Sequence, residues 1–392
     1  MFPSYYEFYC PVKILCGKTS LPNIPYEMQQ LDARRACVVS DQGVADAGLL
    51  DKVQAVFAGS GCEIAAVYDQ TPADSSHRAV NEIAAQYRRD QCDCLLAVGG
   101  GSPIDTAKGV NILVSEGHDD LMRFQGVDRL TRPAAPLIVV PTTSGTGSEV
   151  TSAAVITNAD TGVKMPFMDN RLFPHVAVLD PVMTLTMPPR ITAATGMDAL
   201  THAVEAYYCL GKNPVSDAYA EAAIRLIIEH LVGVVKDGSS AQGRLAMANG
   251  AMIAGMAFSN SMVGVVHSLA HAAGSVCHVP HGVANAIFLP WGMENNLAKA
   301  GDVIAGLAPL LGVTPLPVSK RGQAEAAIQA VRDLTAHLHD LCGLPVTLQQ
   351  AGVERDKLQS IAAAAINDGA VTVNPEDVTE ADALAILERA WS

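Results

Sequence analysis

The feature that most constrains the fold is a change in hydrophobic periodicity near residue 187. Before this point, short apolar runs alternate with amphipathic segments, in the order RACVVSD, VADAGLLDKVQAVFAGSG, EIAAVYD, HRAVNEIAAQYRRD and CLLAVGGG. This order predicts a βαβαβ arrangement and a parallel sheet that is covered on both faces. Further strands are expected at PLIVVPTT, SAAVITN and HVAVLD.

After Pro188 and Pro189 the strand signals stop and helical spacing takes over, as in SDAYAEAAIRLIIEHLVGVV and GQAEAAIQAVRDLTAHLHDL. A chain of 392 residues is long enough for two separate cores. We therefore expect a Rossmann-like α/β domain over residues 1–187 and an all-helical domain over 188–392. The two prolines suit a hinge, because they end a preceding element and can start the next helix.

Charge and composition exclude several classes of partner. The net charge is −14, and no Lys/Arg cluster occurs beyond isolated pairs such as Arg34-Arg35 and Arg88-Arg89, which argues against nucleic acid and anionic membranes. No apolar run reaches the ~18 residues of a membrane span, and the N-terminus lacks the order of a signal peptide. Nine cysteines without a CxxC pair fit a reducing compartment. We expect a cytoplasmic protein.

Four widely spaced residues match a divalent-metal site. Asp198 and His202 lie four apart in GMDALTHAVEAYY, so one helix face should present both side chains. His267 in VVHSLAHAAG and His281 in the Pro-His-Gly turn of VPHGVANA complete a site built from two helices and a loop. Three imidazoles and one carboxylate suit Fe(II), Zn, Ni or Mn better than Ca or Mg.

Histidine pairs at helical spacing also arise by chance, so their surroundings matter. His202, His267 and His271 all lie in apolar, Ala-rich segments, where an unpaired imidazole costs a few kcal/mol in lost hydrogen bonds. A metal would satisfy them. The segment HSLAH is not a zinc-protease motif, because Ser268 stands where HExxH needs a Glu.

Two glycine-rich turns follow predicted strands. In LLAVGGGSPIDTAKG, three glycines (Gly99 to Gly101) precede Ser102 as an N-cap, Pro103 at the first helical position and Asp105 in the first turn. Such a turn can cradle a phosphate, although a tight turn without a ligand is an equally open interpretation. The second turn spans residues 142–148, TTSGTGS, and two anion-friendly turns at strand ends suggest a bound diphosphate.

Asp41 ends the first strand of this arrangement, VVSD. A carboxylate there commonly accepts hydrogen bonds from an adenosine ribose and repels a 2′-phosphate, which favours NAD over NADP. The alternative is that Asp41 only caps the helix that follows.

Together these motifs resemble the iron-containing (group III) alcohol dehydrogenases over essentially the full length. The segments that carry the resemblance are GGGSPIDTAKG, PTTSGTGSEVT, LDP at 179–181, ATGMDALTHAVEAY, FSN at 258–260, VVHSLAHAAG and PHGVANAI. It implies a dehydroquinate synthase-like fold, with the active site between the two domains and iron held by Asp198, His202, His267 and His281. It also implies NAD contacts from Asp41, Gly100, Gly101, Ser102, Thr142, Thr143, Thr146, Lys164 and Leu179.

The expected chemistry follows from these residues. A metal that accepts the alcohol oxygen lowers the pKa of the alcohol and holds the alkoxide, from which hydride leaves to the nicotinamide. By resemblance, His271 lies beside the nicotinamide and the substrate. It relays the released proton to water, or it orients a ligand and packs on the nicotinamide. Lys164 either bonds ribose hydroxyls, as the resemblance favours, or only ends a strand.

The substrate is expected to be a short primary alcohol or a diol, or the aldehyde in the reverse direction. Phe258, Ala153 and Phe167 would line an apolar pocket. Ala153 stands where many relatives have Asn, and NPE at 374–376 replaces the commoner NPR. The family also commonly forms dimers and larger rings, so a homo-oligomer is expected.

Three alternatives compete with this interpretation. A glycerol dehydrogenase-like zinc polyol oxidoreductase shares the fold, but its usual site has one Asp and two His ligands. A dehydroquinate synthase-like lyase needs a Glu-led metal set and basic residues for an acidic substrate. A metal- or nucleotide-binding sensor would bind without turnover.

Overall fold

The computed structural model of the chain describes residues 3–392, which form two compact units. The first unit is Cys10–Met187, and the second is Pro188–Ser392 together with the N-terminal segment that ends at Tyr9. Within the second unit, the backbone N–H of Tyr9 donates to Asn260 Oδ1 at 2.7 Å. The functions that the sequence assigned to the domains 1–187 and 188–392 stay predictions.

The first unit is built on a six-stranded sheet in which every neighbouring pair of strands is parallel. This confirms the predicted α/β class. The strand order is β1-β9-β6-β4-β2-β3, and the strands are β1 (Lys13–Cys16), β2 (Arg35–Val39), β3 (Glu63–Tyr68), β4 (Cys94–Gly99), β6 (Leu137–Pro141) and β9 (Val176–Leu179). Every residue of β4 and β6 is buried, because helices cover both faces of a sheet of this kind.

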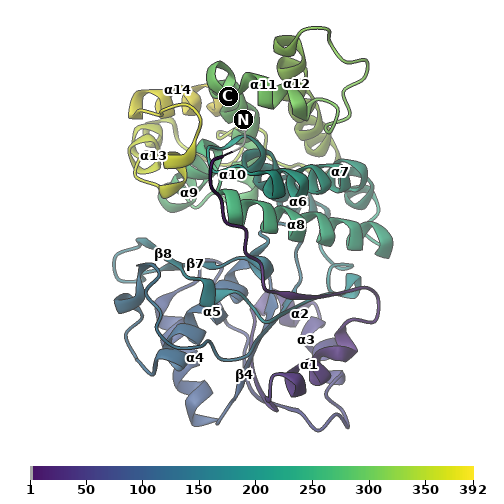
Figure 1. Ribbon diagram of the computed structural model, residues 1–392, viewed down its shortest axis with the longest axis vertical. Coiled ribbons are helices and arrows are strands. Elements are labelled where there is room, and N and C mark those ends of the chain that lie inside the picture. Colours follow the sequence, from purple (N-terminus) through teal and green to yellow (C-terminus); the bar gives the residue numbers. More distant parts are fainter. Residues whose placement is uncertain (1–2) are drawn as a thin grey trace. The chain divides into compact units, whose positions relative to one another are not determined.

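Five helices accompany this sheet, and Figure 1 shows α4 and α5 on one side of β4 with α1, α2 and α3 on the other. They are α1 (Ile24–Gln30), α2 (Gln42–Asp46), α3 (Leu49–Ala55), α4 (His77–Arg89) and α5 (Gly101–Glu116). The segment VADAGLLDKVQAVFAGSG was expected to be one helix, and this is wrong. Gly48 has a left-handed backbone (φ 67°), which separates α2 from α3.

The strand order creates a topological switch at β2. The chain passes from β2 to β3 on one side and then returns to β4 on the other side of β2. In open parallel sheets, ligands bind outside the carboxyl ends of the strands at such a switch. The residues that follow these ends are Asp41 after β2 and the glycines after β4.

A second, three-stranded sheet contains β5 (Gly126–Val127), β7 (Ala153–Thr157) and β8 (Lys164–Met168) in the order β5-β8-β7. The predicted strand SAAVITN therefore forms β7 outside the parallel sheet, paired antiparallel with β8. A short turn closes this hairpin, since the backbone N–H of Asn158 donates to the carbonyl of Val163 at 2.8 Å. Burial alternates along both strands, as expected for a sheet with one solvated face.

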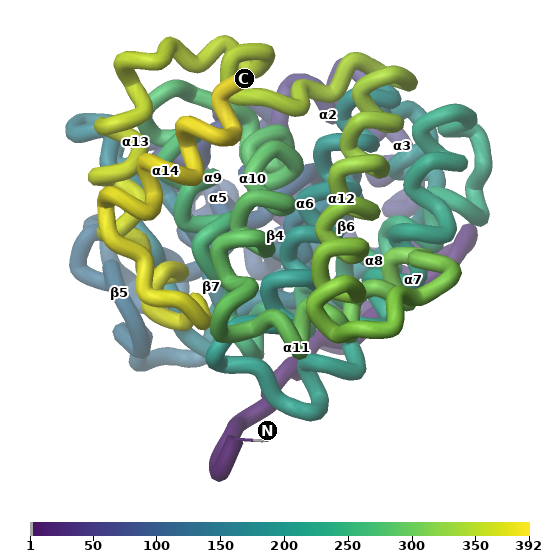
Figure 2. The backbone as a smooth tube through the Cα atoms, turned by 90° about the horizontal axis from the view of Figure 1, so that it is seen from above, coloured from purple at the N-terminus to yellow at the C-terminus, as the bar shows by residue number. Residues whose placement is uncertain are grey.

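The second unit is helical, as predicted, and its described residues contain no strand. Its α-helices are α6 (Pro189–Tyr208), α7 (Pro214–Lys236), α8 (Ala241–Ser261), α9 (Val265–Cys277), α10 (His281–Asn295), α11 (Leu297–Leu307), α12 (Lys320–Cys342), α13 (Leu358–Ala365) and α14 (Glu380–Trp391). Helix α6 packs against α7, α8 and α10, and α10 also packs against α9 (Figure 2). These helices share one hydrophobic core.

Within residues 3–392, no single helix is long and apolar enough to cross a membrane. Helices α8 and α9 pass the same test of length and composition only as a pair, with a bend of 104° between them. Both supply buried side chains to the core of the second unit.

Close packing between α6 and α10 depends on Gly282. A Cβ atom at this position would lie 2.4 Å from the carbonyl oxygen of Ala194 in α6, and a backbone atom cannot rotate away. We predict that Gly282→Ala lowers the free energy of unfolding by about 1–3 kcal/mol, measured by urea denaturation. Gly233→Ala is the control, because a Cβ there meets no atom within 4 Å and should stabilise α7 by up to ~1 kcal/mol. Equal effects of the two substitutions would contradict this account.

Candidate functional site

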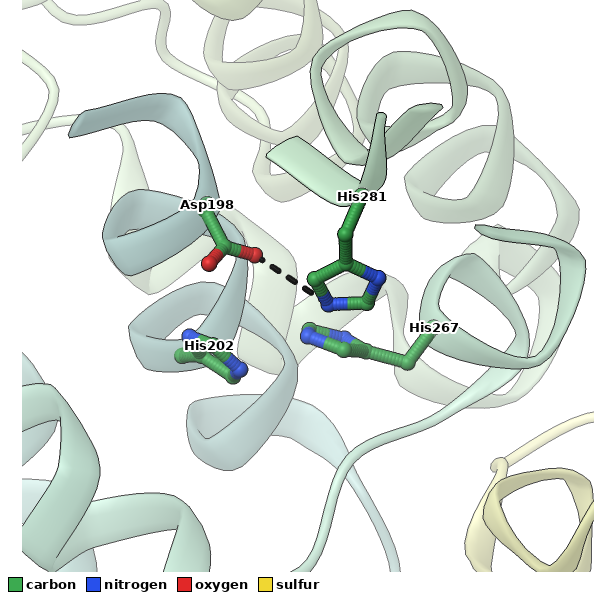
Figure 3. Close-up of side chains that lie close together, drawn as sticks. All are labelled: Asp198, His202, His267 and His281. Carbon is green, nitrogen blue, oxygen red and sulfur yellow. Dashed lines mark ion pairs between the residues drawn. The ribbon is translucent and has the colours of Figure 1, made fainter. Parts of the chain in front are cut away.

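The four predicted metal ligands converge in the second unit. Asp198 and His202 project from α6, one turn apart, and His267 and His281 reach them from α9 and α10 (Figure 3). One ligand atom from each of the four side chains lies within 4.8 Å of all the others. The sequence placed His281 in a loop, which is wrong. It is the first residue of α10, since the Pro280 carbonyl already accepts the N–H groups of Val283 and Ala284.

The cluster is almost closed to solvent. Asp198 and His267 are each 2% exposed and His202 is 5% exposed, whereas the side chain of His281 retains 36%. Nε2 of His281 lies 3.4 Å from Oδ1 of Asp198. The His202 ring stacks on Phe258 with ring centroids 4.2 Å apart, so the one predicted pocket residue of this unit contacts the cluster directly.

The protonation states suit metal binding. Burial lowers the pKa of His267 well below its usual value, and the neighbouring His202 and His281 lower it further. Burial alone would raise the pKa of Asp198, but the three imidazoles outweigh it and the pKa ends below the ordinary value. A buried carboxylate needs a compensating positive charge, which a divalent cation can supply. The donor set therefore fits the metal that the sequence predicted.

Asn285 belongs to the same cluster, although the sequence analysis missed it. Its amide nitrogen donates to Oδ1 of Asp198 at 2.6 Å and lies 3.1 Å from Nε2 of His281 and 3.3 Å from Nε2 of His267. The signal that could have revealed it is its spacing, because it follows His281 by four residues on α10.

Glu205 was also missed. It follows Asp198 by seven residues on α6, and its Oε2 lies 2.6 Å from Nδ1 of His267. Burial raises the pKa of Glu205. Hydrogen bonds from the backbone N–H groups of Gly264, Val266 and His267 oppose this shift without cancelling it.

His271 lies one turn beyond His267 and outside the ligand cluster. Its ring stacks on that of His281 with centroids 5.2 Å apart. Nδ1 of His271 is 2.8 Å from Oδ2 of Asp368, and Oδ1 of the same carboxylate accepts the N–H of Ala370. Asp368 lies far along the chain in a segment without regular periodicity, so nothing in the sequence identified it as this partner.

The two glycine-rich turns of the first unit touch each other. They follow β4 and β6, which are neighbours in the sheet, and Thr142 N–H donates to the Gly99 carbonyl at 3.0 Å. A Cβ on Gly100 would meet Thr143 Oγ1 at 3.1 Å, and one on Gly101 would meet the Thr146 methyl at 3.0 Å. A side chain at either position would therefore push against a threonine, because the second turn packs directly against the first.

The helix after the first turn begins earlier than predicted. Helix α5 starts at Gly101 with Gly100 as its N-cap, so Ser102 is not the cap and Pro103 is not the first helical residue. The Ser102 hydroxyl instead donates to the carbonyl of Ala73. The N-terminal N–H groups of α5 therefore start at the glycines, as a phosphate cradle requires.

A buried lysine joins α5 to the second turn. Lys108 Nζ donates to Ser148 Oγ at 3.2 Å, to both oxygens of Thr151 at 2.9 Å and to the Ala153 carbonyl at 2.8 Å. Burial lowers the pKa of Lys108 to about 8, and the neighbouring Asp105 opposes this shift. Asp105 was expected in the first turn of this helix, but it lies beyond that turn because α5 starts at Gly101. Its carboxylate accepts a hydrogen bond from Ser148 Oγ at 2.7 Å.

Three further predicted cofactor residues lie in the same unit. Asp41 is the N-cap of α2, with its Oδ1 accepting from Val44 N–H at 2.9 Å, so the capping alternative is observed. Lys164 begins β8 and forms an ion pair with Asp74 at 3.2 Å. Leu179 ends β9 with a buried side chain. Phe167, which was expected to line the substrate pocket, lies in β8 and is buried, with 1% of its surface exposed.

Known proteins match the chain along nearly its whole length. The family models "Iron-containing alcohol dehydrogenase" and "Fe-containing alcohol dehydrogenase family, C-terminal" match residues 11–181 and 192–391. The 1,3-propanediol dehydrogenase of Klebsiella pneumoniae is 37% identical, over 98% of this chain and 99% of that protein. The NAD-dependent methanol dehydrogenase of Bacillus methanolicus is 34% identical, also over 98% of this chain and 99% of that protein.

The fold is similar as well. A crystal structure of 1,3-propanediol oxidoreductase superposes with a TM-score of 0.95 at 37% identity and covers 99% of this chain and 100% of that one. This agrees with the predicted two-domain, dehydroquinate synthase-like fold. By sequence and by structure, the chain is a member of the iron-containing alcohol dehydrogenase family.

Proposed function

We propose that this protein oxidises a short primary alcohol or a diol with NAD, and reduces the aldehyde in the reverse direction, at a metal site made of Asp198, His202, His267 and His281. The observation that carries the proposal is the convergence of four ligand atoms within 4.8 Å in a nearly closed core. Relatives that act on 1,3-propanediol and methanol support an alcohol substrate.

When bound, a divalent ion supplies Lewis acidity and NAD supplies the hydride acceptor. The protein's own residues hold these groups and keep water from the buried side of the site. Asp198 contributes the one negative charge of the ligand set, and the low pKa of His267 keeps its imidazole neutral, so that one ring nitrogen retains a lone pair for a metal. The Phe258 ring fixes the plane of His202.

The proposed ion is Fe(II), with Zn(II) as the alternative. The family name favours iron, whereas three imidazoles and a carboxylate accept either ion. Enzyme reconstituted separately with Fe(II) and Zn(II), assayed on a panel of alcohols and aldehydes with NAD(H) and NADP(H), tests the metal, the substrate and the cofactor together.

The proposed NAD site lies at the carboxyl ends of β2, β4 and β6. The switch point at β2, the touching glycine-rich turns and the N-terminus of α5 support it. The proposed contacts are Asp41, Gly100, Gly101, Ser102, Thr142, Thr143, Thr146, Lys164 and Leu179. Capping leaves the second carboxylate oxygen of Asp41 for a ribose hydroxyl.

His271 is proposed as the catalytic residue that passes the released proton to water. Asp368 accepts from Nδ1, which leaves Nε2 as a proton acceptor, and the 36% exposed side chain can reach solvent. A homo-oligomeric assembly and a cytoplasmic location stay predictions.

We predict that His267→Ala and Asp198→Ala each lose bound metal and at least ~100-fold of alcohol oxidation, because each removes a proposed ligand. Metal content by mass spectrometry and steady-state NADH formation measure the two effects. His337→Ala is the control, since this histidine is exposed on α12. Full activity in metal-free enzyme would contradict the mechanism.

We predict that Asp41→Asn raises the ratio of kcat/KM with NADP to that with NAD by at least ~10-fold. Asn caps helices as well as Asp does, so the substitution removes the charge and keeps the cap. Asp41→Gly, which also removes the side chain, should raise the ratio similarly. If neither substitution changes the ratio, Asp41 acts only as a cap.

We predict that His271→Ala lowers kcat while the metal content stays at the wild-type value. Asp368→Asn should lower kcat less, because the imidazole remains. If His271 serves instead to orient a ligand, His271→Ala will release metal in proportion to the activity that it loses.

A further inference from the structure

The carboxylate of Glu205 is completely buried beneath the four proposed metal ligands. It lies on α6 three residues after His202 and seven after Asp198, on the face that bears both. Its exposed fraction is 0%, and its only ion-pair partner within the described chain is His267. The mechanism proposed above does not use it.

We propose that Glu205 is a positioning residue that fixes the tautomer and the orientation of His267 for metal binding. This inference rests on the proposed metal site and extends it to a residue that binds no metal itself.

The hydrogen bonds of Glu205 determine which nitrogen of His267 carries the proton. Every partner of the carboxylate is a donor: the N–H of Val266 at 2.9 Å, the N–H of His267 at 3.2 Å and the hydroxyl of Tyr208 at 3.2 Å. Both carboxylate oxygens already accept a backbone N–H, so Glu205 acts as the acceptor and the 2.6 Å contact places the proton on Nδ1 of His267. Nε2, the nitrogen on the side of the cluster, keeps its lone pair for a metal.

The same contacts hold the imidazole in place. The carboxylate binds the first N–H groups of α9 as well as the ring, so the backbone and the side chain of His267 have one common anchor. A Cβ on Gly264 would lie 2.9 Å from Oε1 of Glu205, and therefore the glycine at this N-cap allows the carboxylate to approach.

The choice of a carboxylate gives a second reason. A helix cap alone does not need a carboxylate, because a neutral Asn or Ser side chain satisfies the same N–H groups.

Glu205→Gln separates the two roles. The amide keeps the size of the side chain but brings one N–H₂ group, which must face either Nδ1 of His267 or the N–H groups of α9. Facing Nδ1 moves the ring proton to Nε2 and removes the ligand lone pair, and facing α9 removes the cap. We expect the full-length variant, stripped of metal and titrated with Co(II), to bind about 10- to 100-fold more weakly than the wild type and to show altered d–d absorption.

Two controls report the cost of a buried hydrogen bond by itself. Tyr208→Phe removes a donor to Glu205 without touching His267, and Glu27→Gln alters another buried glutamate, which is paired with Lys13 at 2.7 Å in the first unit. Both should lower the melting temperature of the metal-free protein and leave the Kd for Co(II) unchanged.

The results distinguish this inference from the proposed function. If the wild type itself binds no Co(II), the metal site is wrong. If the wild type binds and Glu205→Gln binds equally well with the same spectrum, only the role of Glu205 is overturned. Should Glu205→Gln fail to fold, ¹⁵N-histidine NMR of the wild type decides: a proton on Nδ1 of His267, identified by loss of the signal in His267→Ala, supports the inference, and a proton on Nε2 refutes it.

Discussion

The arrangement of the helical unit depends on two carboxylates, Asp198 and Glu205, that lie in its apolar core. An isolated buried charge costs several kcal/mol unless donors or a counter-charge compensate for it. The donors present are imidazoles, the amide of Asn285 and the first N–H groups of α9. The proposed divalent ion would supply a full positive charge at the same point, which explains why α6, α9 and α10 all direct polar side chains into an otherwise apolar core.

Local spacing was enough to predict part of this cluster. The four-residue interval between Asp198 and His202 fixes a common helix face, and the geometry brings His267 and His281 to the same point. The partners of these residues could not be predicted in the same way. Asn285 follows His281 by one helical turn, a signal that was hidden while His281 was placed in a loop. Glu205 and Asp368 look like ordinary helix or loop residues in the sequence, and only packing between distant segments makes them hydrogen-bond partners. The start of α10 at His281 was missed because a Pro-His-Gly run also suits a turn.

In the α/β unit, the order of elements was predictable because buried parallel strands are continuous apolar runs. The errors arose where a backbone conformation or a tertiary contact outweighed periodicity. Gly48 divides an otherwise continuous helical pattern, and the hairpin turn after β7 takes a β-branched strand out of the main sheet. Helix α5 starts at Gly101, where the two glycine-rich turns touch, and no single segment encodes that contact.

The proposed ligands come from three different helices, and this affects the stability of the protein. An ion bound by α6, α9 and α10 acts as a reversible cross-link between segments that are far apart in the chain. Because the unfolded chain lacks this site, binding stabilises the folded state by an amount that grows with free metal concentration, about 2.7 kcal/mol at a hundredfold excess over Kd. Cellular metal supply would then control how long the helical unit resists proteases as well as how fast the enzyme turns over.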